Sequence, residues 1–336
     1  MFEKLLEQAA KGDIDEELAL SILEGAREPG NALKLFGLAS KVRDETLGPD
    51  LYWSGGGIRA AVHCKIVPRC KYCTYYARGD FKLDTIVKSA KIMEDIGLKQ
   101  IHLVGGANLQ GYDKEVMEIV QAIRAVSDLG IGLNFGCSLS EETIHKLKGM
   151  NVFGVTIALE TINEDLFSEA KPGDSLEKKK ELMDICEREG IPIHAMLFVG
   201  LGGTLEDRVK LMFYVKQYSQ LTNLSFSRFY PYPGTAYAGH ERCSPWELAT
   251  AVAVARLVLP KADLGIAAGN TADDIPLWYM AGGGNRLQGV YTADNQVVPG
   301  PGELVTRVDD EHVIISRMPV VKQYVEGMGR RISFED

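Results

Sequence analysis

Residues 58–73 read Ile-Arg-Ala-Ala-Val-His-Cys-Lys-Ile-Val-Pro-Arg-Cys-Lys-Tyr-Cys, a short strand-like run followed at once by three cysteines. Three thiolates on one loop can hold three irons of a [4Fe–4S] cluster and leave the fourth iron open to another ligand. The alternatives are a zinc knuckle and inert buried thiols. A closed zinc site needs four ligands, and His63, which directly precedes Cys64, is expected to point to the opposite face of a strand. We therefore favour a cluster held by Cys64, Cys70 and Cys73.

The composition is ordinary for a globular protein of 336 residues, with 46% hydrophobic and 25% charged residues. The net charge of −9 argues against nucleic acid as a partner, because proteins that bind it carry basic patches. Residues 1–12 lack the basic-then-apolar order of a signal peptide, and no apolar run is long enough to cross a membrane. We expect a cytoplasmic protein with reduced cysteines and no membrane partner.

The apolar pattern predicts an α/β protein. Residues 2–47 have helical periodicity, and downstream short apolar runs alternate with amphipathic segments, which is the order of a parallel sheet with crossover helices. Strands are expected near 58–64, 100–105, 131–136, 152–160, 192–199, 223–230, 263–268 and 286–291. Helices are expected near 84–97, 113–127, 140–149, 175–190, 205–220, 245–259 and 274–281. This order favours a (β/α)8 TIM-type barrel over 48–336, with an N-terminal helical extension over 1–47.

Polar residues at the C-terminal ends of barrel strands are candidates for contact with substrate. The cysteine loop follows the first expected strand and therefore belongs to that face. Arg228 could bind an anionic substrate group. Cys137, the other cysteine expected near this face, could be a hydrogen donor or radical partner, and a small buried residue is the favoured alternative. For His102, a hydrogen-bonded core histidine is the alternative. The inward polar candidates are His102, Asn134, Thr156, Arg228 and Asn270.

The cysteine spacing, C-x5-C-x2-C with Tyr72 directly before the last cysteine, resembles the radical S-adenosylmethionine (SAM) superfamily. The usual signature there is C-x3-C-x2-C with an aromatic residue at this place, so the segment that contains Pro68 is longer here. That longer spacing is similar to a group of radical SAM proteins associated with biosynthesis of the iron-guanylylpyridinol cofactor of [Fe]-hydrogenase in methanogens. The barrel with a helical extension resembles the biotin synthase branch.

The resemblance implies two cofactors, a [4Fe–4S] cluster and SAM. The open iron would chelate the methionine part of SAM, and one electron from the cluster would cleave a carbon–sulfur bond to give a 5′-deoxyadenosyl radical. It also implies a small-molecule substrate and a low-potential electron donor of the ferredoxin or flavodoxin type.

The resemblance further implies contacts to SAM from Tyr72 and from the turn at Gly105 and Gly106, where the family often has a following Glu and this chain has Ala107. Glu160, in a Glu-Thr pair at the end of the fourth expected strand, matches an acid that contacts SAM in relatives of biotin synthase. A structural salt bridge is the alternative for Glu160, and a plain turn is the alternative for the glycines.

The resemblance implies two further contacts to SAM at positions that match the family less closely. Lys179 aligns with an Arg that meets the SAM carboxylate, and a solvated surface lysine is the alternative interpretation. The turn at Gly200 resembles a Gly-Leu-Pro-Gly-Gln-Thr turn that passes close to the adenine, although Pro and Gln are missing. The aromatic segment around Tyr230 resembles a stretch of the same branch, and it either encloses a substrate or packs the rim.

The sequence therefore predicts a radical SAM enzyme, by resemblance one that builds the pyridinol part of the [Fe]-hydrogenase cofactor. The alternatives are another biotin-synthase-like enzyme of the hydrogenase maturase or mutase type, an iron–sulfur scaffold without SAM turnover, and a zinc-stabilised TIM-barrel enzyme.

Overall fold

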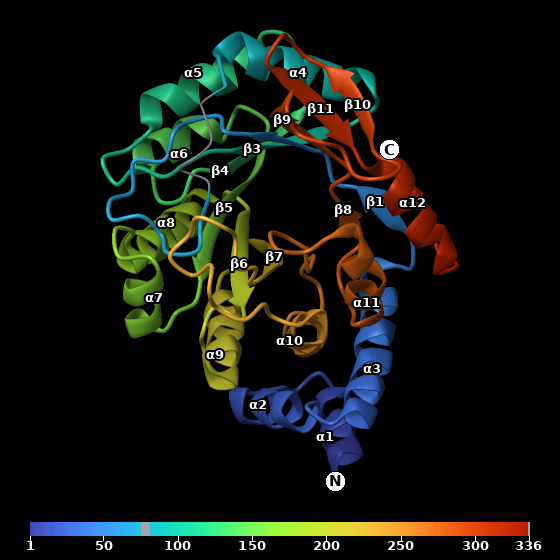
Figure 1. The fold of residues 1–336 in the computed structure, drawn as a ribbon. Coiled ribbons are helices and arrows are strands. Elements are labelled where there is room, and N and C mark those ends of the chain that lie inside the picture. Colours follow the sequence, from blue (N-terminus) through green and yellow to red (C-terminus); the bar gives the residue numbers. More distant parts are fainter. Residues whose placement is uncertain (75–80, 335–336) are drawn as a thin grey trace. The chain divides into compact units, whose positions relative to one another are not determined.

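The computed structural model describes residues 1–74 and 81–334, which form two compact units (Figure 1). Unit 1 and unit 2 are each built from three segments of the chain. Unit 1 comprises Met1–Asp50, Ala158–Ala170 and His194–Asn285, and unit 2 comprises Leu51–Ile157, Lys171–Ile193 and Arg286–Asp336. Among the helices of the described residues, none has the length and apolar character needed to cross a membrane.

The main sheet of unit 2 has the strand order β10-β11-β9-β2-β3-β4-β5. The strands from β9 to β4 pair in parallel, and β10 and β11 continue the sheet as antiparallel strands. Their bounds are β2 Gly56–Arg59, β3 Gln100–Val104, β4 Gly130–Asn134, β5 Val152–Glu160, β9 Val290–Asp294, β10 Leu304–Arg307 and β11 His312–Ser316. A smaller parallel sheet joins β12 Ile332–Ser333, β1 Leu51–Trp53 and β8 Arg286–Leu287.

Helices α4 and α8 of unit 2 illustrate the periodicity and the capping of amphipathic crossover helices. In α4 the buried residues Ile86, Ala90 and Met93 recur at helical spacing. Ser175 is the N-cap of α8, and its side chain accepts a hydrogen bond from Lys178 N. The helix ends at Gly190, whose φ of +69° is left-handed. The helix bounds are α4 Leu83–Asp95, α5 Asp113–Arg124, α6 Glu141–Leu147, α8 Leu176–Glu189 and α12 Met318–Gly327.

Unit 1 is mainly helical, and its strands are the end of β5, β6 Ile193–Val199 and β7 Leu221–Arg228. Helix α10, whose residues from Leu248 to Val258 are all buried, packs against α3 and α2. A helix that is apolar on every side belongs in a core, and α10 is the core element of this unit. The helix bounds are α1 Phe2–Ala9, α2 Glu16–Gly25, α3 Pro29–Leu47, α7 Glu164–Ala170, α9 Leu205–Lys216, α10 Pro245–Val258 and α11 Ile275–Met280.

Most of the expected elements are present, and two expectations about strands are wrong. The strand expected over 58–64 ends at Arg59, because Ala60 takes a left-handed conformation with φ +59°. The segment expected as a strand over 263–268 does pair in parallel with β7, through backbone hydrogen bonds such as Leu224 N to the carbonyl of Asp263 and Gly265 N to that of Leu224, although only isolated bridges are assigned within it. The strand expected over 286–291 divides into β8 and β9.

The ends of the strand order are not joined in the described part of the chain, where the order begins at β10 and ends at β7. The α/β fold with a parallel sheet is confirmed, but barrel closure by hydrogen bonding is not observed. Helices α1 to α3 cover the region expected to be helical. The division into an extension over 1–47 and a barrel over 48–336 stays a prediction. Several short elements were not expected, namely β1, β10, β11, β12, α7 and α12.

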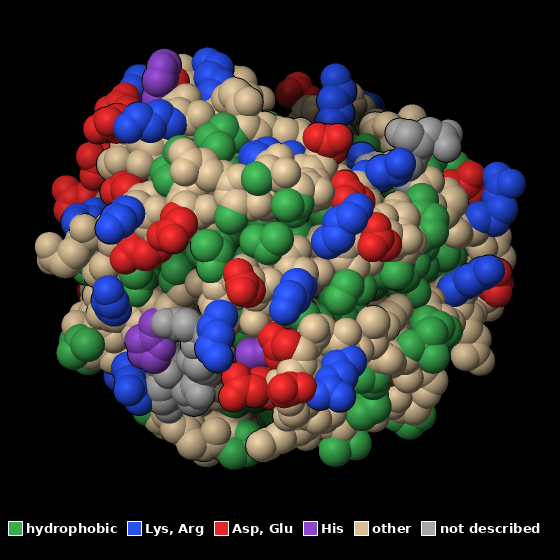
Figure 2. Space-filling view, turned by 90° about the horizontal axis from the view of Figure 1, so that it is seen from above, with side chains coloured by type: hydrophobic (Ala, Val, Ile, Leu, Met, Phe, Trp, Pro, Cys, Tyr) green, Lys and Arg blue, Asp and Glu red, His purple; other side chains and the backbone are tan. Residues whose placement is uncertain are grey.

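Charged side chains of both signs are mixed on the face seen in Figure 2. Blue Lys and Arg side chains alternate with red Asp and Glu side chains, and the described residues on this face form no continuous basic stripe. Mixing of this kind keeps a surface hydrated without a strong field of one sign.

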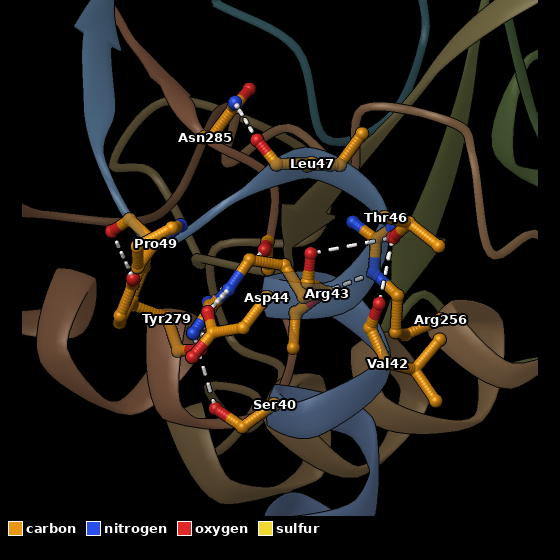
Figure 3. Close-up of polar contacts among 12 residues, drawn as sticks. Ser40, Val42, Arg43, Asp44, Thr46, Leu47, Pro49, Arg256, Tyr279 and Asn285 are labelled. Atoms are coloured by element: carbon orange, nitrogen blue, oxygen red, sulfur yellow. Dashed lines mark hydrogen bonds and ion pairs between the residues drawn. The ribbon is translucent and has the colours of Figure 1, made fainter.

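Arg43 of α3 is fully buried and connects α3 to α11 within unit 1 (Figure 3). It donates to the carbonyl of Tyr279 at 2.8 Å, to Asp44 Oδ1 at 2.6 Å and to Ser40 Oγ at 3.3 Å. Its guanidinium also lies 3.5 Å from the ring centroid of Tyr279, in the geometry of a cation–π contact. The Tyr279 hydroxyl donates in turn to the carbonyl of Pro49 at 2.7 Å.

Arg43→Met should lower the free energy of unfolding by about 2–4 kcal/mol, because buried carbonyls and one carboxylate lose their donor. Chemical denaturation followed by circular dichroism measures the change. Lys41→Ala on the same helix is the control, since the Lys41–Glu45 pair is 70% and 62% exposed and should contribute about 1 kcal/mol or less. Equal losses in the two variants would contradict a structural role for Arg43.

Candidate functional site

The loop that carries the three cysteines runs beside the turn that follows β3. Ala61 N donates to the carbonyl of Val104 at 3.1 Å, Gly106 N to that of Val62 at 2.8 Å, and Lys65 N to that of Ala107 at 2.9 Å. These bonds continue the pairing of β2 with β3 after β2 has ended, so the loop is fixed by its backbone.

Glycine is required where the two segments touch. A methyl group on Gly106 would lie 2.2 Å from the N and Cα atoms of Cys64, and one on Gly105 would lie 2.6 Å from Phe135 and from Val62. Real Cβ atoms do not approach so closely, so only glycine permits this contact. The glycine turn singled out from the sequence is therefore the surface on which the backbone of Cys64 rests.

A second glycine contacts the cysteine loop at its longer segment. A methyl group on Gly173, in the loop between α7 and α8, would lie 2.3 Å from the carbonyl oxygen of Pro68 and 2.5 Å from the carbonyl carbon of Val67. The Tyr112 hydroxyl also donates to the carbonyl of His63. The loop is thus held by backbone contacts at both Gly106 and Gly173.

The donor set of this loop fits an iron–sulfur cluster. Cys64, Cys70 and Cys73 are partly exposed thiols that form no disulfide, and Tyr72 between the last two is buried. Among residues 1–74 and 81–334, no three His, Cys, Asp or Glu side chains converge to hold a single metal ion. The ligands of a cluster do not converge on one ion, because each thiolate binds a different iron.

Two buried lysines share one carboxylate near this loop. Lys171 Nζ and Lys179 Nζ lie 3.0 and 3.1 Å from Asp174 Oδ2, and all three side chains are at most 5% exposed. Burial by itself would raise the pKa of Asp174, but the two ammonium groups outweigh it and hold the pKa well below its ordinary value. The interpretation of Lys179 as a solvated surface residue is therefore wrong.

Lys179 also lies near the ends of two strands of the sheet. Its Nζ is 3.9 Å from the position that a methyl group on Gly136 would take, and Ala107 is 2.7 Å from that same position. Lys179 and the turn after β3 are thus brought together in unit 2. Cys137, the next residue after Gly136, has its Sγ 3.7 Å from Asp174 Oδ1, and burial raises the pKa of its thiol.

Two predicted contacts to SAM lie in unit 1 at strand ends with left-handed backbone. Glu160 ends β5 with φ +69° and is partly exposed. Gly200 follows β6 with φ +86°, and a methyl group there would lie 2.4 Å from Cys243 Cβ. Both residues are therefore at places where the chain turns sharply.

Arg228 has internal partners at the end of β7 in unit 1. Its guanidinium donates to Asp274 Oδ2 at 2.7 Å, to the carbonyl of Cys243 at 3.0 Å and to Asn270 Oδ1 at 3.3 Å. The side chain is only 2% exposed, and Asp274 balances its charge. Tyr230 lies close by in sequence, with its ring 4.8 Å from the guanidinium of Arg242.

The remaining substrate candidates lie on the sheet of unit 2. His102 of β3 is flanked by Gly57 and Gly132 on the neighbouring strands, and its ring meets Phe153 edge-on at 5.0 Å. Burial lowers the pKa of His102 to about 4, although a backbone contact to Ser54 opposes the shift. His102 is therefore neutral at neutral pH.

Asn134 ends β4 and is partly exposed, and its carbonyl accepts a hydrogen bond from Gly105 N at 3.0 Å. Thr156 of β5 is 8% exposed. The substrate roles of these residues stay predictions. Sequence reasoning missed Lys171 and Asp174, although a Lys-Pro-Gly-Asp-Ser stretch before a helix shows a turn and an N-cap.

Comparison with known proteins shows the family. The family model described as the radical SAM superfamily matches residues 67–215. An uncharacterized protein of Methanocaldococcus jannaschii is 32% identical over 261 residues, which cover 74% of this chain and 67% of that protein. The chain belongs to the radical SAM superfamily. As a radical SAM enzyme, it uses a [4Fe–4S] cluster and SAM.

Biotin synthases and two solved enzymes are further similar proteins. The biotin synthase of Chlamydia pneumoniae is 22% identical over 254 residues, covering 71% of this chain and 76% of that enzyme. The crystal structure of methylornithine synthase (PylB) has a TM-score of 0.80 at 19% identity and covers 98% of this chain and 97% of that one. The X-ray structure of the FeFe-hydrogenase maturase HydG from Carboxydothermus hydrogenoformans has a TM-score of 0.80 at 18% identity. The match covers 100% of this chain and 80% of that one. These structural likenesses establish that the radical SAM protein shares their fold.

Stability should fall as the pH drops from 6.5 to about 4, because unfolded His102 binds a proton in this range and folded His102 does not. The contribution of this residue between pH 7 and pH 5 is about 2 kcal/mol, at about 1.4 kcal/mol per unit of pKa. Urea unfolding of wild type and His102→Gln at both pH values measures it. The pH dependence should be smaller in the variant by that amount, and parallel curves would show that His102 is not buried as a neutral residue.

Gly173→Ala should displace the cysteine loop, because the new methyl group would lie 2.3–2.6 Å from backbone atoms of Val67 and Pro68, so one of the two segments must shift. We expect a loss of about 1–3 kcal/mol in stability, which is typical of overpacking, and less iron per chain after anaerobic reconstitution. Gly149→Ala is the matched control, since nothing lies within 4 Å of a methyl group there. Iron content equal to wild type in Gly173→Ala would show that this contact does not position the loop.

Proposed function

We propose that Cys64, Cys70 and Cys73 hold the cluster of this radical SAM enzyme. The observation that carries the proposal is the loop itself, on which three thiols follow a short strand and the backbone is fixed at Gly106 and Gly173. When bound, the cluster supplies one electron that cleaves SAM reductively to methionine and a 5′-deoxyadenosyl radical.

The residues of unit 2 would orient SAM in different ways. Lys179 would bind its carboxylate as a point charge, while Asp174 keeps the ammonium group in place at 3.1 Å. Tyr72, Gly105 and Gly106 would border the cofactor, and the bare glycine backbone would allow close approach. The resemblance to the family also implies contacts to SAM from Glu160 and from the turn at Gly200.

The finer proposal is a role in building the pyridinol part of the iron-guanylylpyridinol cofactor of [Fe]-hydrogenase. Its support is the C-x5-C-x2-C spacing, which resembles the group called HmdB or HcgA. The reductant would be of the ferredoxin or flavodoxin type, and the substrate a small molecule contacted by residues such as His102, Asn134 and Thr156. The strands would form the (β/α)8 barrel of the family.

Anaerobic reconstitution should load about four irons per wild-type chain, and SAM with dithionite should then give 5′-deoxyadenosine. Cys64→Ala, Cys70→Ala and Cys73→Ala should each lose the cluster and the product. Cys186→Ala is the control, because this thiol is fully buried on α8 and should leave both unchanged. Iron analysis and chromatography of the nucleoside measure the two results.

Equal iron and equal product in wild type and the three loop variants would overturn the ligand assignment. A chain that loads iron but shows no change in its cluster EPR signal on addition of SAM would be a scaffold. Incubation of the active enzyme with candidate pyridinol precursors, with mass spectrometry of the products, tests the finer proposal separately from cofactor cleavage.

A further inference from the structure

Exposed apolar side chains gather in one segment of unit 2. Val297, Val298, Leu304 and Val305 are 41%, 87%, 58% and 49% exposed. Elsewhere in the described chain, the large exposed apolar residues stand singly in the sequence, as is normal for a protein surface. A concentration of this kind on neighbouring residues is typical of a surface that meets another protein.

This segment includes β10, which is the outermost strand of the sheet order in unit 2 (Figure 1). All four of its residues, Leu304–Arg307, are exposed, so both faces of the strand are open. Its strand partner is β11, and no other strand of residues 1–74 and 81–334 pairs with the opposite edge of β10. An exposed edge with apolar side chains is a site where another strand can add.

The hydrogen-bond pattern shows which backbone groups lie on the open edge. Val308 N donates to the carbonyl of His312 at 3.0 Å, so these two residues form a hydrogen-bonded pair of the β10–β11 ladder. Such pairs recur at every second residue of an antiparallel ladder, which assigns Leu304 and Thr306 to the bonds with β11. The N–H and carbonyl groups of Val305 and Arg307 therefore point away from β11.

The side chains of this edge are complementary to themselves. When two copies of the strand pair antiparallel with Val305 opposite Val305, Glu303 of one copy lies opposite Arg307 of the other, twice across the axis. Sliding one strand by two residues instead places Glu303 opposite Asp309, or Arg307 opposite Pro301, which has no N–H to donate. The register centred on Val305 is the one that pairs opposite charges.

Both charged side chains make hydrogen bonds to residues a few positions away in their own chain. Glu303 Oε2 accepts a hydrogen bond from Gly300 N at 2.7 Å, which holds the carboxylate beside the strand. Arg307 pairs with Asp310, and these side chains are 71% and 93% exposed. Such a surface pair contributes little, so Arg307 can turn toward a second copy at small cost.

We propose that the chain forms a homodimer in which β10 of one copy pairs antiparallel with β10 of a second copy, with Val305 on the twofold axis. The pairing extends the sheet of unit 2 and covers Leu304 and Val305. An isologous contact of this kind closes after two copies, so it gives a dimer rather than a filament. The strands are short, so the interface is small and the dissociation constant falls in the micromolar range.

Val305→Pro tests the pairing with little effect on the fold. The N–H of Val305 faces away from β11, so proline removes bonds between copies and leaves the β10–β11 ladder intact. Sedimentation velocity over about 1–200 μM, a range that brackets micromolar dissociation, should show a monomer–dimer equilibrium for wild type and a monomer for the variant. Val126→Lys is the control, since this exposed residue follows α5 and should leave association unchanged.

Charge reversal tests the register. Glu303→Lys and Arg307→Glu should each weaken the dimer at least tenfold, because like charges then face each other across the axis. The double variant restores opposite charges and should regain most of the affinity. Unfolding curves confirm that each variant is folded. A monomer at every concentration, a dimer that persists in Val305→Pro, or a double variant no tighter than the single ones would overturn the proposal.

Discussion

The backbone contact between the cysteine loop and two glycines is the constraint on which the proposed site depends. Strand β2 ends at Arg59, and beyond it backbone hydrogen bonds to the segment after β3 hold the loop. Gly106 and Gly173 add to this order, because each lets another segment approach the loop more closely than any side chain would allow. The course of the backbone that carries Cys64 and the Val67–Pro68 segment therefore follows from this packing.

The second constraint is electrostatic and acts through the same loop of unit 2 that contains Gly173. Asp174 neutralises charge from Lys171 and Lys179 where water is largely excluded, and burying these ammonium groups without a counter-charge would be costly. An anionic group that enters beside Lys179 meets an ammonium already desolvated and oriented. The side chain of Lys179 loses its conformational entropy during folding, so this loss does not weaken the binding of the anion.

The sequence predicted those features that depend on neighbours along the chain. Alternation and helical periodicity located β3, β4, β5 and most crossover helices, and cysteine spacing with Tyr72 indicated the family. It did not predict the ion pair of Arg228 with Asp274 or the burial of Lys179, because both depend on partners that the fold brings together. The end of β2 was missed since Ala60 gives no sign of a left-handed conformation.

The longer spacing between Cys64 and Cys70 now has a structural account. The residues between them provide two anchors, Lys65 N on the carbonyl of Ala107 at 2.9 Å and the Val67–Pro68 backbone against Gly173. With two residues fewer between Cys64 and Cys70, the segment would be less able to contact both the carbonyl of Ala107 and Gly173. Because Gly173 directly precedes Asp174, the second anchor ties the loop that holds the thiols to the carboxylate that positions Lys179. The insertion thus couples the proposed cluster ligands to the proposed anion-binding lysine through one short stretch of backbone.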